Sequence, residues 1–288
     1  MKILLVNKYL YRKGGAETYF IKLGEYLKSL GNEVEYFGMA DERNCVGNRV
    51  EAYTENIDFH KKSLKHITYP FKIIYSVNAR KQIRKVLSDF KPDVVHLNNF
   101  NYQLTPSIIY EIKKHNIPIV YTAHDVQLVC PNHKLKNDYT DGLCRKCDGG
   151  KYFECVKNNC VHSSKIRSIL GAVEAWYYKL RHTYKMIDLT VCPSEFMEKE
   201  ISRNDDINGR TVTMYNFIDE IKPLGAECEN YVLYFGRYSE EKGISNLVKA
   251  AKKLSNIPFV FAGKGELENE VNSADNIKTV SYTHLRAH

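Results

Sequence analysis

The sequence predicts an α/β protein made of two doubly wound parallel-sheet domains, the second of them incomplete. Short apolar runs rich in β-branched and aromatic residues alternate with stretches of helical periodicity along most of the chain, a pattern typical of βαβ units. Glycines and polar residues follow the apolar runs, and doubly wound proteins bind their ligands at these carboxyl ends of strands. A polar stretch at 204–209 separates two such series, so we expect a domain boundary there.

Composition indicates a globular protein but does not select its ligand. The chain has 288 residues, of which 43% are hydrophobic and 26% charged. No apolar run approaches the roughly 18 residues that span a membrane, and Met1–Val6 is too short for a signal peptide. We therefore expect a cytoplasmic protein whose eight cysteines stay reduced. The net charge of +8 is compatible with nucleic acid, an anionic membrane surface or phosphorylated small molecules.

The first series, residues 1–204, is expected to form one complete domain. Its strands are predicted at 3–6, 33–37, 94–97, 117–122 and 189–192. Its helices are the amphipathic stretches from Gly14 to Gly31, over about 71–90, around 108–112, over 166–184 and over 196–201. A cysteine-rich insert at 130–162 interrupts the alternation before the fourth of these helices.

The second series, residues 205–288, has fewer elements than a doubly wound domain needs. Strands are predicted at 211–215, 231–235 and 258–262, the second of them buried, and a helix begins near Ile244. Three strands are too few to bury both faces of a parallel sheet. Residues 281–288 have no periodicity. We therefore expect a truncated reading frame, with a foreign tail at its end.

The loop Gly236–Gly243 joins a predicted strand to a predicted helix. Free backbone N–H groups and the helix dipole favour an anion at such a position. Arg237 adds a planar two-pronged donor and Lys242 a compact charge, which together suit a diphosphate. The alternative is a basic surface loop.

Two further motifs follow predicted strands of the first domain. Gly14 and Gly15 would let the backbone approach a ligand closely, or they form a simple turn before a helix. His124 could donate to a sugar hydroxyl or a developing charge with Asp125 orienting it, or the pair could cap a helix. His96, Asn98 and Asn99 also fall at a strand end.

The insert carries closely spaced cysteines in a segment without an evident core. Cys144, Cys147, Cys155 and Cys160 form two close pairs that suit a tetrahedral structural zinc site. One of Cys130, His133 and His162 could replace a ligand. Plain reduced cysteines are the alternative, and a redox pair is less natural because the motif does not open a helix.

The stretch from Lys165 to Lys185 combines a continuous apolar stripe with flanking basic residues. A basic amphipathic helix can lie on anionic lipid. Most such stripes are core faces instead. Peripheral contact with the inner face of the plasma membrane therefore stays one of two interpretations.

Six motifs, taken in their order and spacing, make the chain resemble the family 4 glycosyltransferases up to about Lys278. They are Gly14-Gly15-Ala16-Glu17, His124-Asp125, Pro193-Ser194-Glu195-Phe196, Tyr215-Asn216-Phe217-Ile218-Asp219, the Gly236–Gly243 loop and Ala262-Gly263-Lys264-Gly265-Glu266. A cysteine-bearing insert after His-Asp is similar to one in a subset of these enzymes. The resemblance implies the GT-B-like architecture of two facing Rossmann-like domains, with acceptor-side residues 1–204 and a partial nucleotide-sugar-binding domain at 205–288.

The resemblance also implies an activity. The enzyme would be a retaining glycosyltransferase of the hexosyltransferase type, moving a sugar from a nucleotide-diphosphate sugar to a glycan or lipid-linked acceptor in cell-envelope polysaccharide biosynthesis. His124 would contact the transferred sugar. Arg237 and Lys242 would hold the donor diphosphate and stabilise its departure.

Other residues enter through the same resemblance. Donor-side or cleft positions fall on Gly14, Gly15, Asn216, Gly236, Gly263 and Gly265. Catalysis would need no metal, because arginine and lysine neutralise the diphosphate. In the family an acidic Glu-x7-Glu motif that grips the donor lies downstream of the glycine loop, and the chain ends before it. We therefore expect an incomplete donor site, and the chain by itself could be inactive.

Two rival functions remain. A UDP-sugar epimerase of GT-B architecture should carry acid and base carboxylates in its cleft, and no convincing pair is evident. A zinc-containing nucleic-acid-binding protein should gather its basic residues on one face among aromatic residues. Basic residues here are spread over most predicted helices, so we expect no nucleic-acid partner.

Overall fold

The computed structural model describes residues 1–56, 69–137, 142–218 and 230–280. It divides into two compact units, Met1–Ile218 and Asp219–His288. The predicted tail at 281–288 lies outside the described residues. Within the described residues, no helix is both long and apolar enough to cross a membrane.

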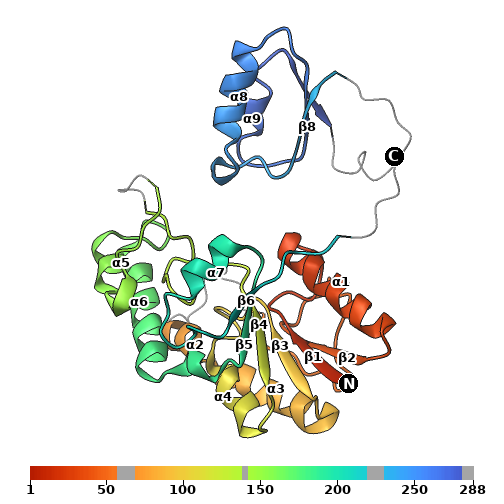
Figure 1. Cartoon of the computed structure of the whole chain (residues 1–288), viewed down its shortest axis with the longest axis vertical. Helices are drawn as coiled ribbons and strands as arrows, with labels where there is room; N and C mark the ends of the chain where they lie inside the picture. Colours follow the sequence, from red (N-terminus) through yellow and green to blue (C-terminus); the bar gives the residue numbers. More distant parts are fainter. Residues whose placement is uncertain (57–68, 138–141, 219–229, 281–288) are drawn as a thin grey trace. The chain divides into compact units, whose positions relative to one another are not determined.

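The first unit is built on a six-stranded parallel sheet (Figure 1). Its strands, in spatial order, are β2 (Glu33–Phe37), β1 (Lys2–Val6), β3 (Val94–Leu97), β4 (Ile119–Thr122), β5 (Leu189–Cys192) and β6 (Thr211–Thr213). Its helices are α1 (Gly15–Ser29), α2 (Tyr69–Ile74), α3 (Val77–Phe90), α4 (Ser107–Lys114), α5 (Phe153–Lys157), α6 (Lys165–Leu180) and α7 (Glu195–Ile201). Short 3₁₀ helices are η2 (Asp148–Gly150) and η3 (Thr183–Met186).

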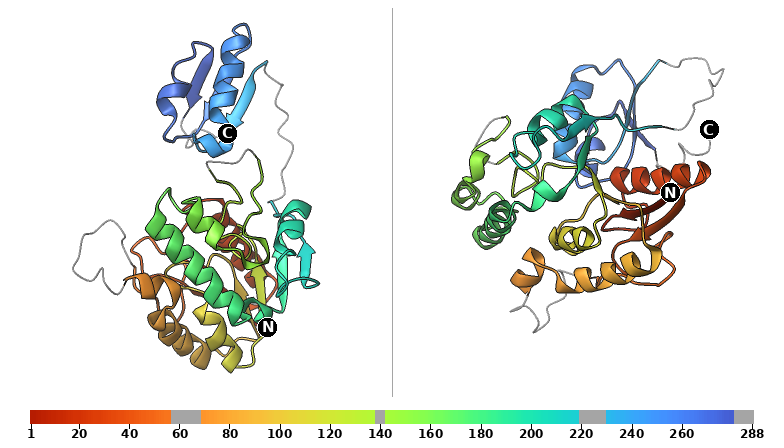
Figure 2. Two further views of the ribbon diagram at one scale, coloured as in Figure 1. Left: turned by 90° about the vertical axis from the view of Figure 1, so that its left-hand side faces the viewer. Right: turned by 60° about the horizontal axis from the view of Figure 1, so that its bottom comes forward.

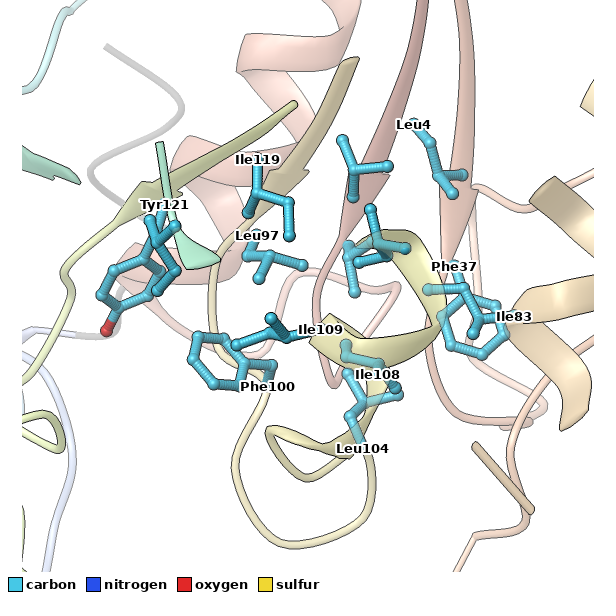
Figure 3. Packing of buried hydrophobic residues seen from close by; sticks show 14 of the residues in the cluster. Leu4, Phe37, Ile83, Leu97, Phe100, Leu104, Ile108, Ile109, Ile119 and Tyr121 are labelled. Carbon is cyan, nitrogen blue, oxygen red and sulfur yellow. The ribbon is translucent and has the colours of Figure 1, made fainter. Parts of the chain in front are cut away.

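Alternate residues of each strand face opposite layers of helices, as the two-residue period of a strand requires. Leu4 of β1 belongs to the larger core, where Ile83 of α3 and Ile108 of α4 are also buried (Figure 3). Its neighbour Leu5 belongs to a second cluster with Phe20 of α1. Figure 2 shows α1 and α3 on opposite sides of the strands. The doubly wound arrangement predicted for residues 1–204 is confirmed.

The strand order places a topological switch point beside β1. The chain leaves β1 to form β2 on one side and later returns to form β3 on the other. The loops after β1 and β3 therefore diverge from adjacent strand ends, which is where doubly wound sheets bind ligands. Two hydrogen bonds join these loops, from the Lys8 backbone N–H to the Asn99 carbonyl at 2.7 Å and from the Asn99 N–H to Asn7 Oδ1 at 3.0 Å.

The predicted boundary near residue 204 is too early. Segment 204–209 is a packed turn and not a linker, because Ile207 is fully buried in the first unit's core and Asp206 accepts a hydrogen bond from His182 Nδ1 at 2.8 Å. The strand predicted at 211–215 is β6, which pairs with β5 and so completes the first sheet. The first unit extends to Ile218.

The helix predicted over 71–90 is two helices. Ser76 separates α2 from α3, and its side chain accepts a hydrogen bond from the Ala79 N–H at 3.1 Å, which caps the new helix. Val77, expected on the apolar side, is exposed. The helix predicted over 166–184 likewise ends at Leu180, and η3 follows.

The cysteine-rich insert lies between β4 and α6 and contains η2 and α5. Neighbouring elements hold it in place. Arg145 donates to the buried carboxylate of Glu200 in α7, and Trp176 Nε1 donates to the Gly150 carbonyl at 2.9 Å. The insert is therefore fastened to α6 and α7.

The second unit contains a three-stranded parallel sheet of β7 (Val232–Phe235), β8 (Phe259–Ala262) and β9 (Ile277–Val280), with η4 (Glu240–Lys242), α8 (Ile244–Lys253) and α9 (Glu268–Val271). The expectation that β7 is buried is wrong, since Phe235 is 68% exposed. β7 is an edge strand among the described residues. The core of the second unit lies around Phe261 and Val248, and Phe235 is not part of it.

Candidate functional site

His124 lies just after β4, at the carboxyl edge of the first sheet. Its Nε2 donates to Asn98 Oδ1 at 2.8 Å, and the Tyr19 ring meets the imidazole edge-on with centroids 5.4 Å apart. Burial lowers the pKa of His124 to about 4, although Asp125 opposes the shift. The imidazole is therefore neutral at pH 7, and Nδ1 carries a lone pair that can accept a hydrogen bond.

The expectation that Asp125 orients His124 is wrong, because Asn98 contacts the ring instead. Asp125 turns toward the insert, where its Oδ2 lies 3.5 Å from His133 Nδ1, and its Oδ1 accepts from the Gln127 N–H at 2.9 Å. Sequence proximity suggested the wrong partner because side chains of adjacent residues at a strand end diverge. His133, considered as a metal ligand, is part of this polar network.

Gly14 and Gly15 form the start of α1, as predicted. Gly14 is the N-cap and provides no side chain to cap the helix. A Cβ on Gly15 would have no atom within 4 Å among its surroundings, so the backbone there is open to an approaching group. The N-terminus of α1 has the backbone geometry that can bind an anion, but the carboxylate of Glu17 already lies beside Gly14, where a Cβ would be 3.3 Å from Glu17 Oε2.

Asn216 is exposed in the segment after β6. Its neighbour Phe217 packs against Tyr19 at a centroid separation of 5.2 Å. Tyr19 in turn contacts His124. Asn216 is therefore brought to the same region of the first unit as His124, which its position in the sequence alone did not show.

In the second unit, Arg237 and Lys242 both lie exposed on the loop between β7 and α8, as predicted. Arg237 Nη2 forms an ion pair with Glu241 Oε1 at 2.7 Å. The hydroxyl of Ser239 is buried and has no partner among the described residues. Gly243, in the left-handed region at φ 73°, is the N-cap of α8 and leaves that helix without a side-chain cap.

Gly236, Gly263 and Gly265 bring two loops of the second unit into backbone contact. A Cβ on Gly263 would lie 1.9 Å from the Gly236 carbonyl oxygen, and one on Gly265 would lie 2.2 Å from that of Tyr238. The Tyr238 N–H donates to the Lys264 carbonyl at 3.0 Å across the same junction. The structure gives these glycines a packing role, and their predicted contact with a nucleotide stays a prediction.

The four cysteines predicted to bind zinc lie close together. Cys144, Cys147, Cys155 and Cys160 line one cavity of about 10 Å³ together with Cys130. Burial raises the pKa of the Cys147 thiol to about 12. Within the described part of the chain, however, no three His, Cys, Asp or Glu side chains are arranged so that they could hold a metal ion. Thiolate chemistry suits zinc, but this arrangement does not form its site, and the zinc assignment stays a prediction.

Family models match almost the whole described chain. The model for Glycosyltransferase Family 4 matches residues 13–221, and that for Glycosyl transferases group 1 matches residues 217–283. The chain belongs to glycosyltransferase family 4. It is a glycosyltransferase enzyme of the two-domain Rossmann-like fold, as its six motifs predicted.

Solved structures support the fold of this glycosyltransferase. HepE of Anabaena, solved with UDP and glucose, is 16% identical with a TM-score of 0.56, over 98% of this chain and 69% of that one. Sucrose-phosphate synthase of Thermosynechococcus elongatus is 14% identical with a TM-score of 0.61, over 97% and 70%.

A curated relative has a higher sequence identity to this chain than these two solved structures do. The "Uncharacterized 42.6 kDa protein in cps region" of Klebsiella pneumoniae is 25% identical over 280 residues, which cover 92% of this chain and 68% of the relative.

Several polar residues of the glycosyltransferase's first unit were not predicted as site residues. Lys8, Asn101 and Tyr102 lie in the loops after β1 and β3, and Lys8 Nζ donates to Asn101 Oδ1 at 2.8 Å. Their only signal in the sequence was a position shortly after a predicted strand. Asn98 had that signal too, but its contact with His124 depends on the pairing of β3 with β4.

Proposed function

We propose that this family 4 enzyme transfers a sugar, with retention at the anomeric carbon, from a nucleotide-diphosphate sugar to a glycan or lipid-linked acceptor. The observation that carries the proposal is the Gly236–Gly243 loop, where Arg237 and Lys242 are exposed beside the uncapped N-terminus of α8. Two cations and free backbone N–H groups are the donors that a diphosphate requires. HepE, which has the same fold, was solved with UDP.

The ion pair between Arg237 and Glu241 does not prevent such binding. Both side chains are more than half exposed, and exposed pairs of this kind contribute only about 0–1 kcal/mol. A diphosphate offers the guanidinium two oxygens in a bidentate arrangement and carries more negative charge than one carboxylate. Arg237 would therefore exchange Glu241 for the donor. As the glycosidic bond to the diphosphate breaks, Arg237 and Lys242 would stabilise the charge on the leaving group.

His124 would contact the transferred sugar as a neutral hydrogen-bond acceptor. Its Nε2 proton is committed to Asn98, and a pKa of about 4 excludes a cationic ring at pH 7. A neutral ring does not repel the positive charge that develops on the sugar during transfer. The buried Nδ2 of Asn98 has no partner among the described residues, which is a mark of a site that a ligand or water completes.

Cell-envelope polysaccharide biosynthesis is the proposed setting, and two observations support it. The relative from Klebsiella pneumoniae is described as lying in the cps region. Part of the apolar stripe of α6 lies outside the core, since Ile166, Ile169 and Val173 are exposed, and Lys165 and Arg167 lie beside it. Exposed apolar residues with a basic flank suit an anionic membrane surface, where a lipid-linked acceptor would be found.

Binding tests address the donor first. Titration calorimetry with UDP, GDP and ADP should show binding of one nucleoside diphosphate, weakened at least tenfold in Arg237→Met and unchanged in Lys28→Met. Equal affinity of Arg237→Met and the unchanged chain for every nucleotide would contradict the proposal.

Flotation with anionic liposomes tests the membrane contact, and Ile166→Asp should reduce the floated fraction at low salt.

A further inference from the structure

We propose that Lys8, Asn101 and Tyr102 form a subsite for an anionic group on the acceptor. The group would be the phosphoester of a lipid-linked sugar or the carboxylate of a uronic acid, which share the chemistry that a lysine recognises. This inference rests on the proposed function, and it adds the class of acceptor.

The subsite lies at the switch point of the first sheet. Lys8 follows β1, and Asn101 and Tyr102 follow β3, so the two loops that diverge there supply all three residues. A hydrogen bond from the Lys8 backbone to Asn99 and another from Lys8 Nζ to Asn101 Oδ1 at 2.8 Å hold the loops together. His124 follows the next strand, β4, at the same edge.

Lys8 is a half-buried cation without a close counter-charge. Its Nζ lies 5.2 Å from the ring centroids of both Tyr9 and Tyr102. No carboxylate within the described residues lies at ion-pair distance from it, and Asp125 and Glu17 act on it only from further away. Burial, together with the charge of Lys13, lowers the pKa of Lys8 to about 8. An anion at this point would restore the full charge and relieve the repulsion.

The residues around Lys8 are held in costly backbone conformations. Tyr102 at φ 58° and His133 at φ 62° lie in the left-handed region, which costs a non-glycine residue roughly 1–2 kcal/mol. Their rings stack with centroids 5.7 Å apart, and Asn101 Nδ2 lies 3.3 Å from His133 Nδ1. Strain of this kind persists where surrounding contacts enforce it, and it concentrates at ligand clamps. The Tyr102 ring, held by its stacking on His133, therefore lies beside the ammonium group of Lys8.

An acceptor is a better ligand for this subsite than the donor diphosphate. Arg237 and Lys242 of the second unit already provide the two cations that a diphosphate needs. Lys8 is a single point charge with an amide and an aromatic ring beside it, which suits one anionic group attached to a sugar ring. The lysine charge would bind the anion, and Asn101 and Tyr102 would lie beside it.

The test compares three soluble probes with the full chain by titration calorimetry. The probes are methyl glucoside, methyl glucuronide and a short-chain prenyl phosphoglucose. We expect at least one anionic probe to bind about tenfold more tightly than the neutral glucoside, because a charge-assisted hydrogen bond contributes about that much. A preference for the phosphoglucose alone identifies a phosphoester, and a preference for the glucuronide alone identifies a uronate.

Variants separate this subsite from the donor loop. Lys8→Met should abolish the preference for the anion, and Asn101→Asp, which places a carboxylate beside Nζ, should reduce it without removing the lysine. Lys28→Met is the matched control, since Lys28 Nζ lies 5.0 Å from the Tyr36 ring on an exposed part of α1. Arg237→Met should lose nucleotide binding and keep the preference.

The outcomes distinguish failure of the subsite from failure of the proposed function. Equal binding of all three probes, no binding of any, or an unchanged preference in Lys8→Met would overturn the subsite. Loss of the preference in Arg237→Met would place the anion at the donor loop and would overturn it too. Nucleotide binding by the unchanged chain is scored separately and tests the donor site alone.

Discussion

Replacing Gly263 by alanine should selectively loosen the second unit. The added Cβ would lie 1.9 Å from the Gly236 carbonyl oxygen and 3.0 Å from its carbon, so backbone would have to move. Moving either loop strains the hydrogen bonds from the Gly236 N–H to Ala262 at 2.9 Å and from the Tyr238 N–H to Lys264 at 3.0 Å. Each contributes about 0.5–1.5 kcal/mol, and overpacking costs about 1–3 kcal/mol.

Alanine also reduces the conformational entropy of the unfolded chain, which offsets about 0.4–1 kcal/mol of this destabilisation. We therefore expect the stability of the second unit to fall by about 2–4 kcal/mol. Amide hydrogen exchange over β7 and β8 should become correspondingly faster. The single tryptophan, Trp176, lies on α6 of the first unit, so its fluorescence transition in urea should stay in place. Gly15→Ala is the control, because its Cβ would meet no atom within 4 Å.

Two results would refute this reasoning. Exchange over β7 and β8 that is as slow in Gly263→Ala as in the unchanged chain would show that the loops accommodate the methyl group without cost. A shift of the Trp176 transition in the same variant would show that the damage is not confined to the second unit. A preserved exchange rate together with weaker nucleotide binding would instead assign Gly263 to ligand approach.

Three other predictions concern titration, metal and the donor loop. Burial lowers the pKa values of His96 and His124 from 6.5 to about 4, because the fold disfavours their charged forms. The contribution of these two histidines to the unfolding free energy should therefore be fully present above about pH 6.5 and should be lost as the pH falls toward 4. A urea midpoint that stays constant between pH 6.5 and pH 4 would contradict this prediction. Elemental analysis tests the predicted zinc site: about one zinc per chain, lost in Cys147→Ser but not in Cys45→Ser, would show that the thiols rearrange around a metal, whereas a metal-free protein with freely titrating thiols would agree with their arrangement among the described residues and argue for plain reduced cysteines. Glu241→Gln should strengthen nucleoside diphosphate binding about two- to fivefold by releasing Arg237 from an exposed ion pair, and weaker binding would show that the carboxylate positions the guanidinium.

The strands of the first unit's parallel sheet could be predicted because each has a pattern in its own short stretch of sequence. An apolar run followed by a polar residue or glycine predicts a buried strand and its exit, and β1 and β3, followed by Asn7 and Asn98, show this pattern most clearly. The errors came from long-range packing. Ile207 lies in a segment of turn-forming residues, and only its burial against the first sheet shows that the domain continues. Phe235 has the composition of a core strand, but β7 pairs on one side only among the described residues.

The candidate site was predictable where its chemistry lies in a single loop and not where it depends on neighbours across the sheet. Arg237 and Lys242 could be placed on one loop because both precede a predicted helix start in the sequence, and anion binding by that loop stays a prediction. The role of His124 could not, since its partner Asn98 comes from another strand and sets which nitrogen carries the proton. That contact changes the predicted function of the ring from donor to acceptor.

Lys8 shows why the acceptor is the hardest part of this enzyme to infer from sequence. The six motifs that identify the family carry groups that would serve the donor and the transferred sugar, and Lys8, Asn101 and Tyr102 belong to none of them. Residues that choose among acceptors need not be shared by enzymes with different acceptors. They must, however, stand where the acceptor can meet the transferred sugar, and we propose the switch point after β1 and β3 as that place. Specificity in this family should therefore be sought in unshared polar residues of these two loops, and exchanging both loops between relatives should change the acceptor while leaving nucleotide affinity unaltered.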